Sequence, residues 1–210
     1  MRMLDVHTHV LFGVDDGVET LEESLDVLKE YKENGMEYIV LTPHINHPAI
    51  KSDLKAIKER FTILATESKK FGVELFLGSE VYLTPDVKEF IPINDKFVVI
   101  ELNTLTYPMY LYDKIFDIQL DGYDVILAHV ERYEWLRKNK RVLKKLKDMN
   151  VYFQMNIESL EDDKFFTKNG YVDLVGTDYH GRKKGTIDWR LVKKYWDLFE
   201  NSAKIILGNK

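Results

Sequence analysis

The stretch Asp5-Val6-His7-Thr8-His9-Val10-Leu11-Phe12-Gly13-Val14-Asp15-Asp16-Gly17 places two histidines and two carboxylates directly after a short apolar segment. Residues 3–6 are predicted to form a buried strand. On an extended backbone, His7 and His9 lie two residues apart and therefore point to one face. Imidazole nitrogens and carboxylate oxygens are common ligands of divalent metals. A histidine pair alone is weak evidence, because histidines at a strand end also bond to backbone groups.

Length and composition are those of an ordinary globular protein. The chain has 210 residues, of which 45% are hydrophobic and 31% charged, and we expect a single domain over residues 1–210. No apolar run approaches the roughly 20 residues of a membrane span. The sequence enters its first strand at once, with no room for a signal peptide, so we expect a cytoplasmic protein.

Charge and cysteine content exclude several classes of function. The net charge of −5 argues against a general nucleic-acid-binding protein, whose affinity depends on neutralising phosphates. The chain contains no cysteine. Disulfides, thiolate metal sites and cysteine-nucleophile mechanisms, including that of the common tyrosine phosphatases, are therefore excluded.

Seven apolar segments have the composition of buried strands, and helical patterns separate them. The expected strands are residues 3–6, 38–41, 73–77, 97–100, 125–128, 151–155 and 172–175. The expected helices include residues 21–34, 54–71, 109–120 and 134–149, a shorter one before Gly170, and a final one carrying Trp189 to Phe199. Residues 205–207 are a possible eighth strand. Nearly continuous apolar strands joined by helices indicate a parallel sheet, either open and doubly wound or closed into a barrel.

A residue able to bind metal follows nearly every expected strand. These residues are His7, His9, His44, Glu80, Glu101, His129, Asp178 and His180. In a barrel, the carboxyl ends of all strands meet at one rim, whereas an open sheet would spread them along an edge. The pattern therefore favours a closed α/β barrel with a metal site at that rim.

Some of these positions have an ordinary structural alternative. Glu101 could pair with a lysine, and His129 could cap a strand. Of the two neighbouring carboxylates, Asp16 is favoured as a ligand, and Asp15 is expected to shape the turn or orient a ligand. His47 is expected at the surface, and Asn156 is a candidate polar contact at the rim.

The residues also resemble a known family. The segments DVHTHVLFGVDDGVETLEESL, IVLTPH, GSEVYLTPDV, the glutamate of VVIEL, GYDVILAHVERY and TDYH extend from residue 5 to residue 180. They resemble the polymerase and histidinol phosphatase (PHP) superfamily. Within it, the similarity is to the manganese-dependent bacterial tyrosine phosphatases of capsule and exopolysaccharide loci. The resemblance implies a distorted, TIM-like (β/α) barrel of seven strands.

The same resemblance implies a site for three divalent metal ions, most plausibly Mn, with Fe or Zn also compatible with the ligands. The implied ligands are His7, His9, Glu80 and Asp178 for one metal, Glu80, Glu101 and His129 for a second, and Asp16, His44 and His180 for a third. Asp178 is expected to serve catalysis as well. Arg132 and Arg182 match arginines that the family uses on the substrate phosphate, although Arg132 could instead pair with Glu131 or Glu134. The loop after His180 is shorter than is usual in the family.

The expected function is hydrolysis of phosphotyrosine in proteins. Clustered metals lower the pKa of a bridging water, and the resulting hydroxide attacks phosphorus without a covalent enzyme intermediate. The resemblance implies a phosphotyrosine-bearing tail, such as that of a bacterial tyrosine kinase, as the partner. A histidinol-phosphatase-like enzyme acting on small phosphomonoesters is the main alternative. A PHP nuclease and a non-catalytic metal-binding protein are less favoured.

A basic run, Arg137 to Lys147, is expected to form a solvated helix face. Val142, Leu143 and Leu146 give it an apolar stripe for the core. The functional alternative is a docking surface for an acidic, tyrosine-bearing tail.

Overall fold

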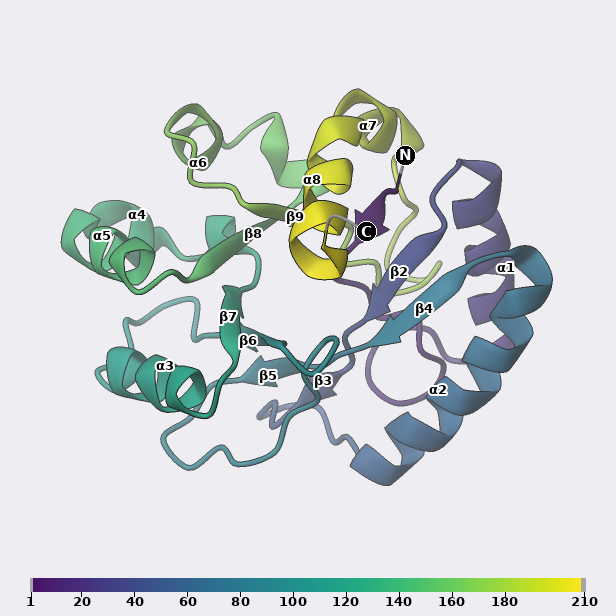
Figure 1. The fold of residues 1–210 in the computed structure, drawn as a ribbon, viewed down its shortest axis with the longest axis horizontal. Coiled ribbons are helices and arrows are strands. Elements are labelled where there is room, and N and C mark those ends of the chain that lie inside the picture. Colours follow the sequence, from purple (N-terminus) through teal and green to yellow (C-terminus); the bar gives the residue numbers. More distant parts are fainter. Residues whose placement is uncertain (1, 209–210) are drawn as a thin grey trace.

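The apolar segments of the chain form parallel strands in the computed structural model, which describes residues 2–208. One sheet has the order β1 (Leu4–Asp5), β2 (Tyr38–Leu41) and β4 (Glu74–Leu77). The other has the order β3 (His44–Ile45), β5 (Glu80–Tyr82), β6 (Phe97–Glu101), β7 (Asp124–Leu127), β8 (Tyr152–Asn156) and β9 (Leu174–Gly176). Together the two sheets curl around a common axis (Figure 1).

Seven of the nine strands occupy the seven predicted positions, and the short strands β3 and β5 lie beyond the predicted bounds. β3 follows β2 after Thr42-Pro43, where proline has no N–H to donate to a ladder. β5 follows β4 after Gly78-Ser79. Hydrogen bonds continue across this seam, because the Gly78 N–H donates to the Leu41 carbonyl at 2.9 Å and the Glu80 N–H to the Pro43 carbonyl at 3.1 Å. The break bends each strand from one sheet into the other.

The barrel closes between the first and last strands. Thr8 and Tyr179, just beyond β1 and β9, form a parallel bridge, and the Asp178 N–H donates to the His7 carbonyl at 2.8 Å. The approach is so close that a Cβ at Gly176 would lie 2.7 Å from the Cβ of His7, so only glycine fits there. The predicted fold class, a distorted parallel α/β barrel, is confirmed.

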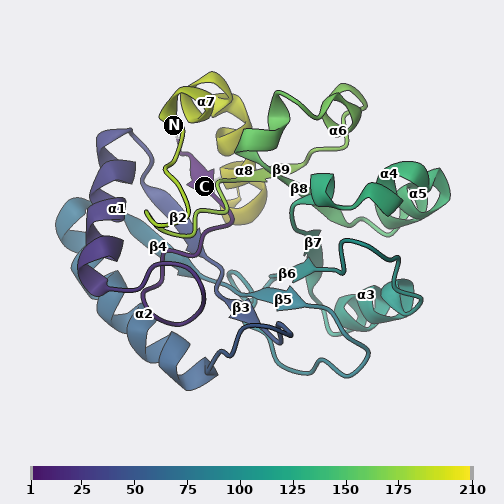
Figure 2. The same ribbon diagram turned by 180° about the vertical axis from the view of Figure 1, so that it is seen from behind.

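Helices surround the barrel on its outside (Figures 1 and 2). They are α1 (Leu21–Glu33), α2 (Leu54–Ser68), α3 (Leu111–Leu120), α4 (Glu134–Lys138), α5 (Lys140–Asp148), α6 (Lys164–Lys168), α7 (Trp189–Lys194) and α8 (Trp196–Leu207), with the 3₁₀ turns η1 (Lys69–Phe71), η2 (Val130–Arg132) and η3 (Ile157–Leu160). The Thr20 side chain caps α1 by accepting a hydrogen bond from the Glu23 N–H. Between residues 2 and 208, no helix combines the length and apolar character that crossing a bilayer requires.

Three details of the helix prediction were wrong. The basic segment 134–149 forms two helices, because Asn139 interrupts it and caps α5 by accepting a bond from the Val142 N–H. The last helical segment is divided at Tyr195 into α7 and α8. Residues 205–207 end α8 and are not a strand, and Ile206 on this turn is buried.

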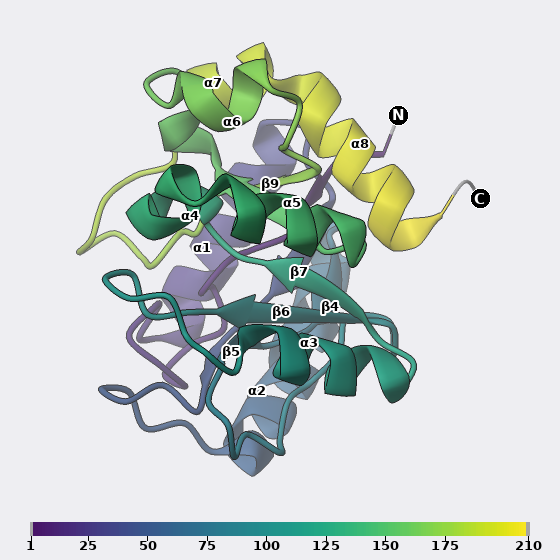
Figure 3. The ribbon, with the colours of Figure 1, turned by 90° about the vertical axis from the view of Figure 1, so that its left-hand side faces the viewer.

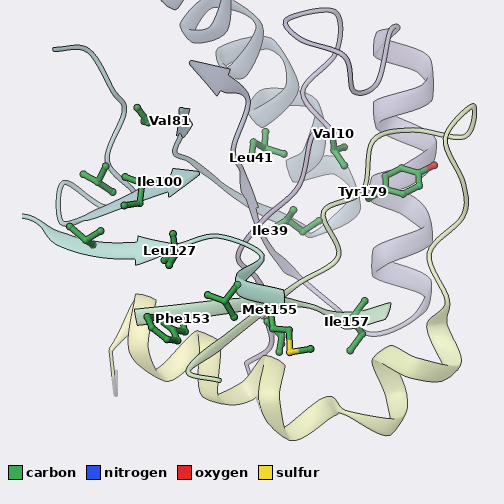
Figure 4. Packing of buried hydrophobic residues seen from close by; sticks show 14 of the residues in the cluster. Val10, Ile39, Leu41, Val81, Ile100, Leu127, Phe153, Met155, Ile157 and Tyr179 are labelled. Carbon is green, nitrogen blue, oxygen red and sulfur yellow. The ribbon is translucent and has the colours of Figure 1, made fainter. Parts of the chain in front are cut away.

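Alternation along the strands divides the apolar side chains into two clusters. Ile39, Leu41, Ile100, Leu127 and Phe153 belong to the larger cluster (Figure 4). This cluster also contains the buried residues of α1 to α7. The smaller cluster contains the intervening side chains Leu4, Val40, Val99, Ile126 and Leu174, together with Ala203 and Ile206 of α8. Apolar side chains and α8 therefore fill the amino-terminal end of the barrel, and polar side chains occupy its other end.

Asp5 of β1 links the first strand to the segment after the last strand, β9, where the barrel closes. Its carboxylate accepts hydrogen bonds from the Thr177 hydroxyl at 2.7 Å, the Thr177 N–H at 3.0 Å and the Tyr31 hydroxyl at 2.7 Å. Burial raises the pKa of Asp5 although these donors oppose the shift. The side chain is fully buried, so removing it leaves several donors without a partner.

We predict that Asp5→Ala lowers the free energy of unfolding by about 3 kcal/mol, because buried donors lose a charged acceptor. Tyr31→Phe removes a single donor and serves as the milder control, with an expected loss of about 1 kcal/mol. Urea unfolding of both variants measures the difference. Equal losses would contradict a role for Asp5 in closing the barrel.

Candidate metal centre

The carboxyl end of the barrel gathers all the predicted ligands. The loops that follow the strands extend together from this end, which lies toward the left of Figure 3. The side chains come from β1 and its loop (His7, His9, Asp16), β3 (His44), β5 (Glu80), β6 (Glu101), the residue after Ala128 (His129) and the segment after β9 (Asp178, His180). All are buried except Asp16 and the half-buried His180.

The first group has the spacing of a metal coordination shell. His7 Nε2 lies 3.1 Å from Glu80 Oε2 and 3.5 Å from Asp178 Oδ1, and His9 Nε2 lies 3.2 and 3.4 Å from the same two oxygens. The two imidazole nitrogens are 3.3 Å apart. Ligand atoms about 2.0–2.2 Å from a tetrahedral metal are separated by about 3.3–3.6 Å. One divalent ion therefore fits among these four atoms, which are the predicted first ligand set.

A second group shares Glu80. His44 Nδ1 lies 3.2 Å from Glu80 Oε2 and 3.3 Å from Glu101 Oε1. His129 Nε2 lies 2.6 Å from the other oxygen of Glu80, Oε1, and 3.9 Å from Glu101 Oε2. The close cluster is thus His44, Glu80 and Glu101, and the predicted ligand His129 contacts Glu80 but lies outside this cluster. Glu80 Oε2 faces His7, His9 and His44 of both groups, and Oε1 faces His129, so this one carboxylate contacts histidines of both groups.

The third group consists of Asp16, His44, His180 and His9. Asp16 Oδ1 is 3.5 Å from His44 Nε2 and 3.8 Å from His180 Nε2. The predicted third set lacked His9, whose ring stacks on that of His180 with 3.9 Å between centroids. The two nitrogens of His44 face different groups, so this ring lies between the second and third sites.

Buried polar atoms without a hydrogen-bond partner support this fit to metal ions. His44 Nδ1, Glu101 Oε1 and Asp178 Oδ1 are buried and make no hydrogen bond among the described residues. Each lies in one of the groups above. Unsatisfied buried atoms are rare in proteins because they cost about 1–3 kcal/mol each. Three in one cluster are explained if cations bind there.

The pKa values of the clustered side chains also indicate a site that attracts cations. Burial lowers the pKa of His9, but the Asp15 carboxylate overcomes this and holds the pKa well above its usual value. Burial likewise opposes ionisation of Asp178, yet His7 and His9 hold its pKa well below its usual range. Burial lowers the pKa of His180 to about 4, so this imidazole is neutral and free to bind a metal. The carboxylates require positive charge, which protons or metal ions can supply.

Unusual backbone conformations aim two of these side chains into the site. His129 and Asp178 have φ angles of 33° and 51°, in the left-handed region that residues other than glycine rarely adopt. Such a conformation costs about 1–3 kcal/mol and is typical of functional sites. The His129 N–H donates to Gln154 Oε1 at 2.7 Å, which stabilises the turn after β7.

Several supporting residues were not predicted. Gln154 also contacts His7 Nδ1 at 3.2 Å, and the Tyr133 hydroxyl lies 3.3 Å from His129 Nδ1. Both orient an imidazole from behind, as partners of metal-binding histidines usually do. A buried glutamine in the apolar segment 151–155 was the available signal, because a buried amide needs partners. Asp15 contacts His9 Nδ1 at 2.7 Å and the Gly17 N–H at 2.9 Å, which fits the orienting role expected for it.

His47 was wrongly expected at the surface. Its Nε2 lies 3.8 Å from Glu101 Oε1 and the side chain is 22% exposed, so the sixth histidine also faces the site. Asn156 donates to Asp178 Oδ2 at 2.9 Å and is a polar contact of the site, as proposed.

The two predicted phosphate-binding arginines lie in different places. The Arg132 guanidinium donates to Asp178 Oδ2, so its partner is neither Glu131 nor Glu134. Arg132 also lines a cavity of about 320 Å³ beside the metal centre. Arg182 lies 3.6 Å from Asp26 of α1 and is not among the residues that line this cavity, so the structure gives its predicted role no support.

Comparison with known proteins agrees with this site. Residues 3–189 match the family model for capsular polysaccharide synthesis, CpsB/CapC. The chain is 31% identical to the tyrosine-protein phosphatase CpsB of Streptococcus agalactiae, over 85% of this chain and 83% of that protein. It is also 31% identical to the putative tyrosine-protein phosphatase CapC of Staphylococcus aureus, over 99% and 92%.

A solved structure confirms the fold. The match is to a chain from the crystal structures of YwqE from Bacillus subtilis and CpsB from Streptococcus pneumoniae, described as unique metal-dependent tyrosine phosphatases. The TM-score is 0.84 at 22% identity, and the alignment covers 99% of this chain and 96% of that one. The family match and the curated relatives confirm the resemblance to the capsule phosphatases noted in the sequence motifs.

We predict that Glu80→Gln binds fewer metal ions than the unaltered protein, because the amide cannot serve as an anionic ligand shared between two sites. Elemental analysis after dialysis against Mn²⁺ measures the metal content, and circular dichroism checks the fold. Glu158→Gln is the matched control, since Glu158 lines the cavity without joining a ligand group. Chelation should lower the melting temperature of the control and change that of Glu80→Gln less. Equal metal content in both variants would contradict the bridging role.

Proposed function

Because the chain belongs to the CpsB/CapC family, we propose that it is a metal-dependent phosphatase that hydrolyses phosphotyrosine in proteins. The observation that carries the proposal is the group of His7, His9, Glu80 and Asp178, whose ligand atoms are spaced for a divalent ion beside a cavity lined by Arg132. The names of the curated relatives support the same reaction.

We propose that nine side chains hold three divalent ions. Eight of them make up the three clusters of ligand atoms, and His129, which lies 2.6 Å from Glu80 Oε1, is the ninth. The ligands are His7, His9, Asp16, His44, Glu80, Glu101, His129, Asp178 and His180. When bound, such ions activate water for attack on phosphorus and neutralise charge on the phosphoryl oxygens. Histidine and carboxylate ligands without sulfur suit Mn²⁺, which we expect, and are also compatible with Fe or Zn.

Arg132 is proposed to bind the substrate phosphate. Its contact with Asp178 orients the guanidinium toward the cavity and uses one of its five N–H donors. The remaining donors can bind two phosphoryl oxygens side by side, and this contact strengthens as charge develops in the transition state. Asp178 thus has two proposed tasks, as a metal ligand and as the group that positions Arg132.

A protein tail is the proposed carrier of the phosphotyrosine, with a bacterial tyrosine kinase of a capsule or exopolysaccharide locus as its source. The cavity is open to solvent beside Arg132 and Lys184, so a side chain on a flexible segment can enter it. Location in the cytoplasm, where such a kinase tail would be found, is part of this proposal.

The basic helix α5 has the amphipathic form that the sequence indicated. Val142, Leu143 and Leu146 are buried, while Lys140 and Lys145 are exposed. If α5 docks an acidic tail, Lys140→Glu/Lys145→Glu should weaken turnover of a tyrosine-phosphorylated acidic peptide and leave p-nitrophenyl phosphate hydrolysis unchanged. Steady-state kinetics on both substrates tests this. Loss of both activities would show that the lysines do not act by docking.

We predict metal-dependent phosphate release from a phosphotyrosine peptide, abolished by chelation and by His7→Ala. Release is measured in the presence of Mn²⁺ with the peptide and with histidinol phosphate side by side. Preference for histidinol phosphate would assign the chain to small-molecule phosphomonoesterases with the same site. If the metal-loaded protein releases phosphate from neither substrate, the proposed function is wrong.

Arg132→Ala should lower kcat/KM for p-nitrophenyl phosphate by about 10²–10³-fold, the usual loss for one group that stabilises transition-state charge. Arg132→Lys should restore part of the activity, because it keeps the charge but loses the planar fork. Metal content is measured in parallel. An unchanged kcat/KM in Arg132→Ala would exclude Arg132 from phosphate binding.

A further inference from the structure

The loop between β9 and α7 carries three consecutive cations, and each one is paired with an acid of the segment that follows β1. Arg182 lies 3.6 Å from Asp26, and the Lys183 ammonium lies 2.7 Å from both oxygens of Glu19. The Lys184 ammonium donates to Asp16 Oδ2. From Arg182 to Lys184, the acidic partner is therefore successively nearer in sequence to the metal-binding residues that follow β1.

These three ion pairs determine which of the three cations faces the metal centre. The turn is tight, because the Lys184 N–H donates to the Gly181 carbonyl at 3.0 Å and Gly181 has a φ angle of +93°. With the turn held in this register, Arg182 lies over α1, and Lys184 is the residue that reaches Asp16. Lys184 lines the 320 Å³ cavity, and neither Arg182 nor Lys183 does.

Lys184 and Arg132 are placed in the same way beside the metal centre, because each binds a carboxylate that is a predicted metal ligand. Each donates to the outer oxygen of a predicted metal ligand, Lys184 to Asp16 Oδ2 and Arg132 to Asp178 Oδ2. The other oxygen of each carboxylate faces the histidines of the site. Both cations line the same cavity. The carboxylates thus orient two positive side chains toward the space beside the proposed metals.

Lys184 has donors to spare for a ligand. An ammonium has three N–H donors, and Asp16 is the partner of its side chain within residues 2–208. The Lys184 side chain is 46% exposed, so the remaining donors are accessible from the cavity. The Lys183 ammonium, in contrast, binds both oxygens of Glu19 away from the cavity.

We propose that Lys184 binds a non-bridging oxygen of the substrate phosphoryl group, in the role that the sequence motif assigned to Arg182. The proposal rests on the proposed phosphatase function and names a second phosphate-binding cation for that site. A phosphomonoester dianion then lies between the guanidinium of Arg132 and the ammonium of Lys184, with the metal centre beside it. An ammonium supplies a point charge there, without the bidentate geometry of a guanidinium.

The test measures binding of inorganic phosphate to the Mn²⁺-loaded protein by calorimetry, alongside p-nitrophenyl phosphate kinetics. Lys184→Met should weaken phosphate binding about tenfold, the loss expected for one charge-assisted hydrogen bond. KM should rise more than kcat falls, and Lys184→Arg should restore most of the affinity. Lys183→Met and Arg182→Met are the matched controls, one and two residues away, and should bind phosphate as the unaltered protein does.

Three results would overturn the proposal. The first is unchanged phosphate affinity in Lys184→Met, and the second is a comparable loss of affinity in Arg182→Met. The third is a loss of metal from Lys184→Met, since the lysine would then act through Asp16 and not on phosphate. Failure of the phosphatase function is a separate result: the unaltered protein would bind phosphate in a Lys184-dependent way but release none from any phosphomonoester.

Discussion

Burial of the Glu80 carboxylate is the constraint on which the rest of this structure depends. Glu80 is 1% exposed, and its oxygens lie within 3.2 Å of nitrogens of His7, His9, His44 and His129. Burying a charge without compensation is prohibitively costly, so a buried carboxylate needs cationic or hydrogen-bonding partners. Four imidazoles surround this carboxylate, and further carboxylates lie close to the imidazoles. Protons on the histidines compensate the negative charge of this cluster only in part, whereas divalent ions compensate it well.

The barrel makes this burial possible because it brings residues from distant parts of the sequence to one rim. Each parallel strand ends at the same end, so a single polar residue after each strand is enough to build a many-sided cluster. Apolar side chains, including those of α8, fill the opposite end of the barrel, so the polar cluster lies above a buried apolar core. Asp5 and its donors hold the seam where the first and last strands meet, directly below His7 and Asp178.

Groups that do not bind metal extend the same electrostatic arrangement outward. Asp15, Gln154 and Tyr133 orient histidines from behind. Arg132 is held by the outer oxygen of Asp178, and Lys184 by that of Asp16. Positive and negative charge therefore alternate from the metal centre to the cavity. The histidines and proposed metals come first, the carboxylates of Asp178 and Asp16 next, and the cations Arg132 and Lys184 last. A dianionic phosphoryl group would complete the alternation, in agreement with the proposed function.

The sequence by itself determined the fold class, seven of the nine strands, and which polar residues gather at the carboxyl end of the barrel. The spacing and number of apolar residues indicate which backbone segments are buried. A metal-binding residue after nearly every strand is not expected from packing alone, so the repetition of His, Asp and Glu at the strand ends indicated a site. Only the tertiary structure decided how these side chains are shared. It placed His44 between two groups, brought His47 to Glu101 and put Gln154 behind His7. It also turned Arg182 toward Asp26 and Lys184 toward the cavity. Those choices depend on contacts between loops far apart in the chain, and local sequence patterns carry no record of them.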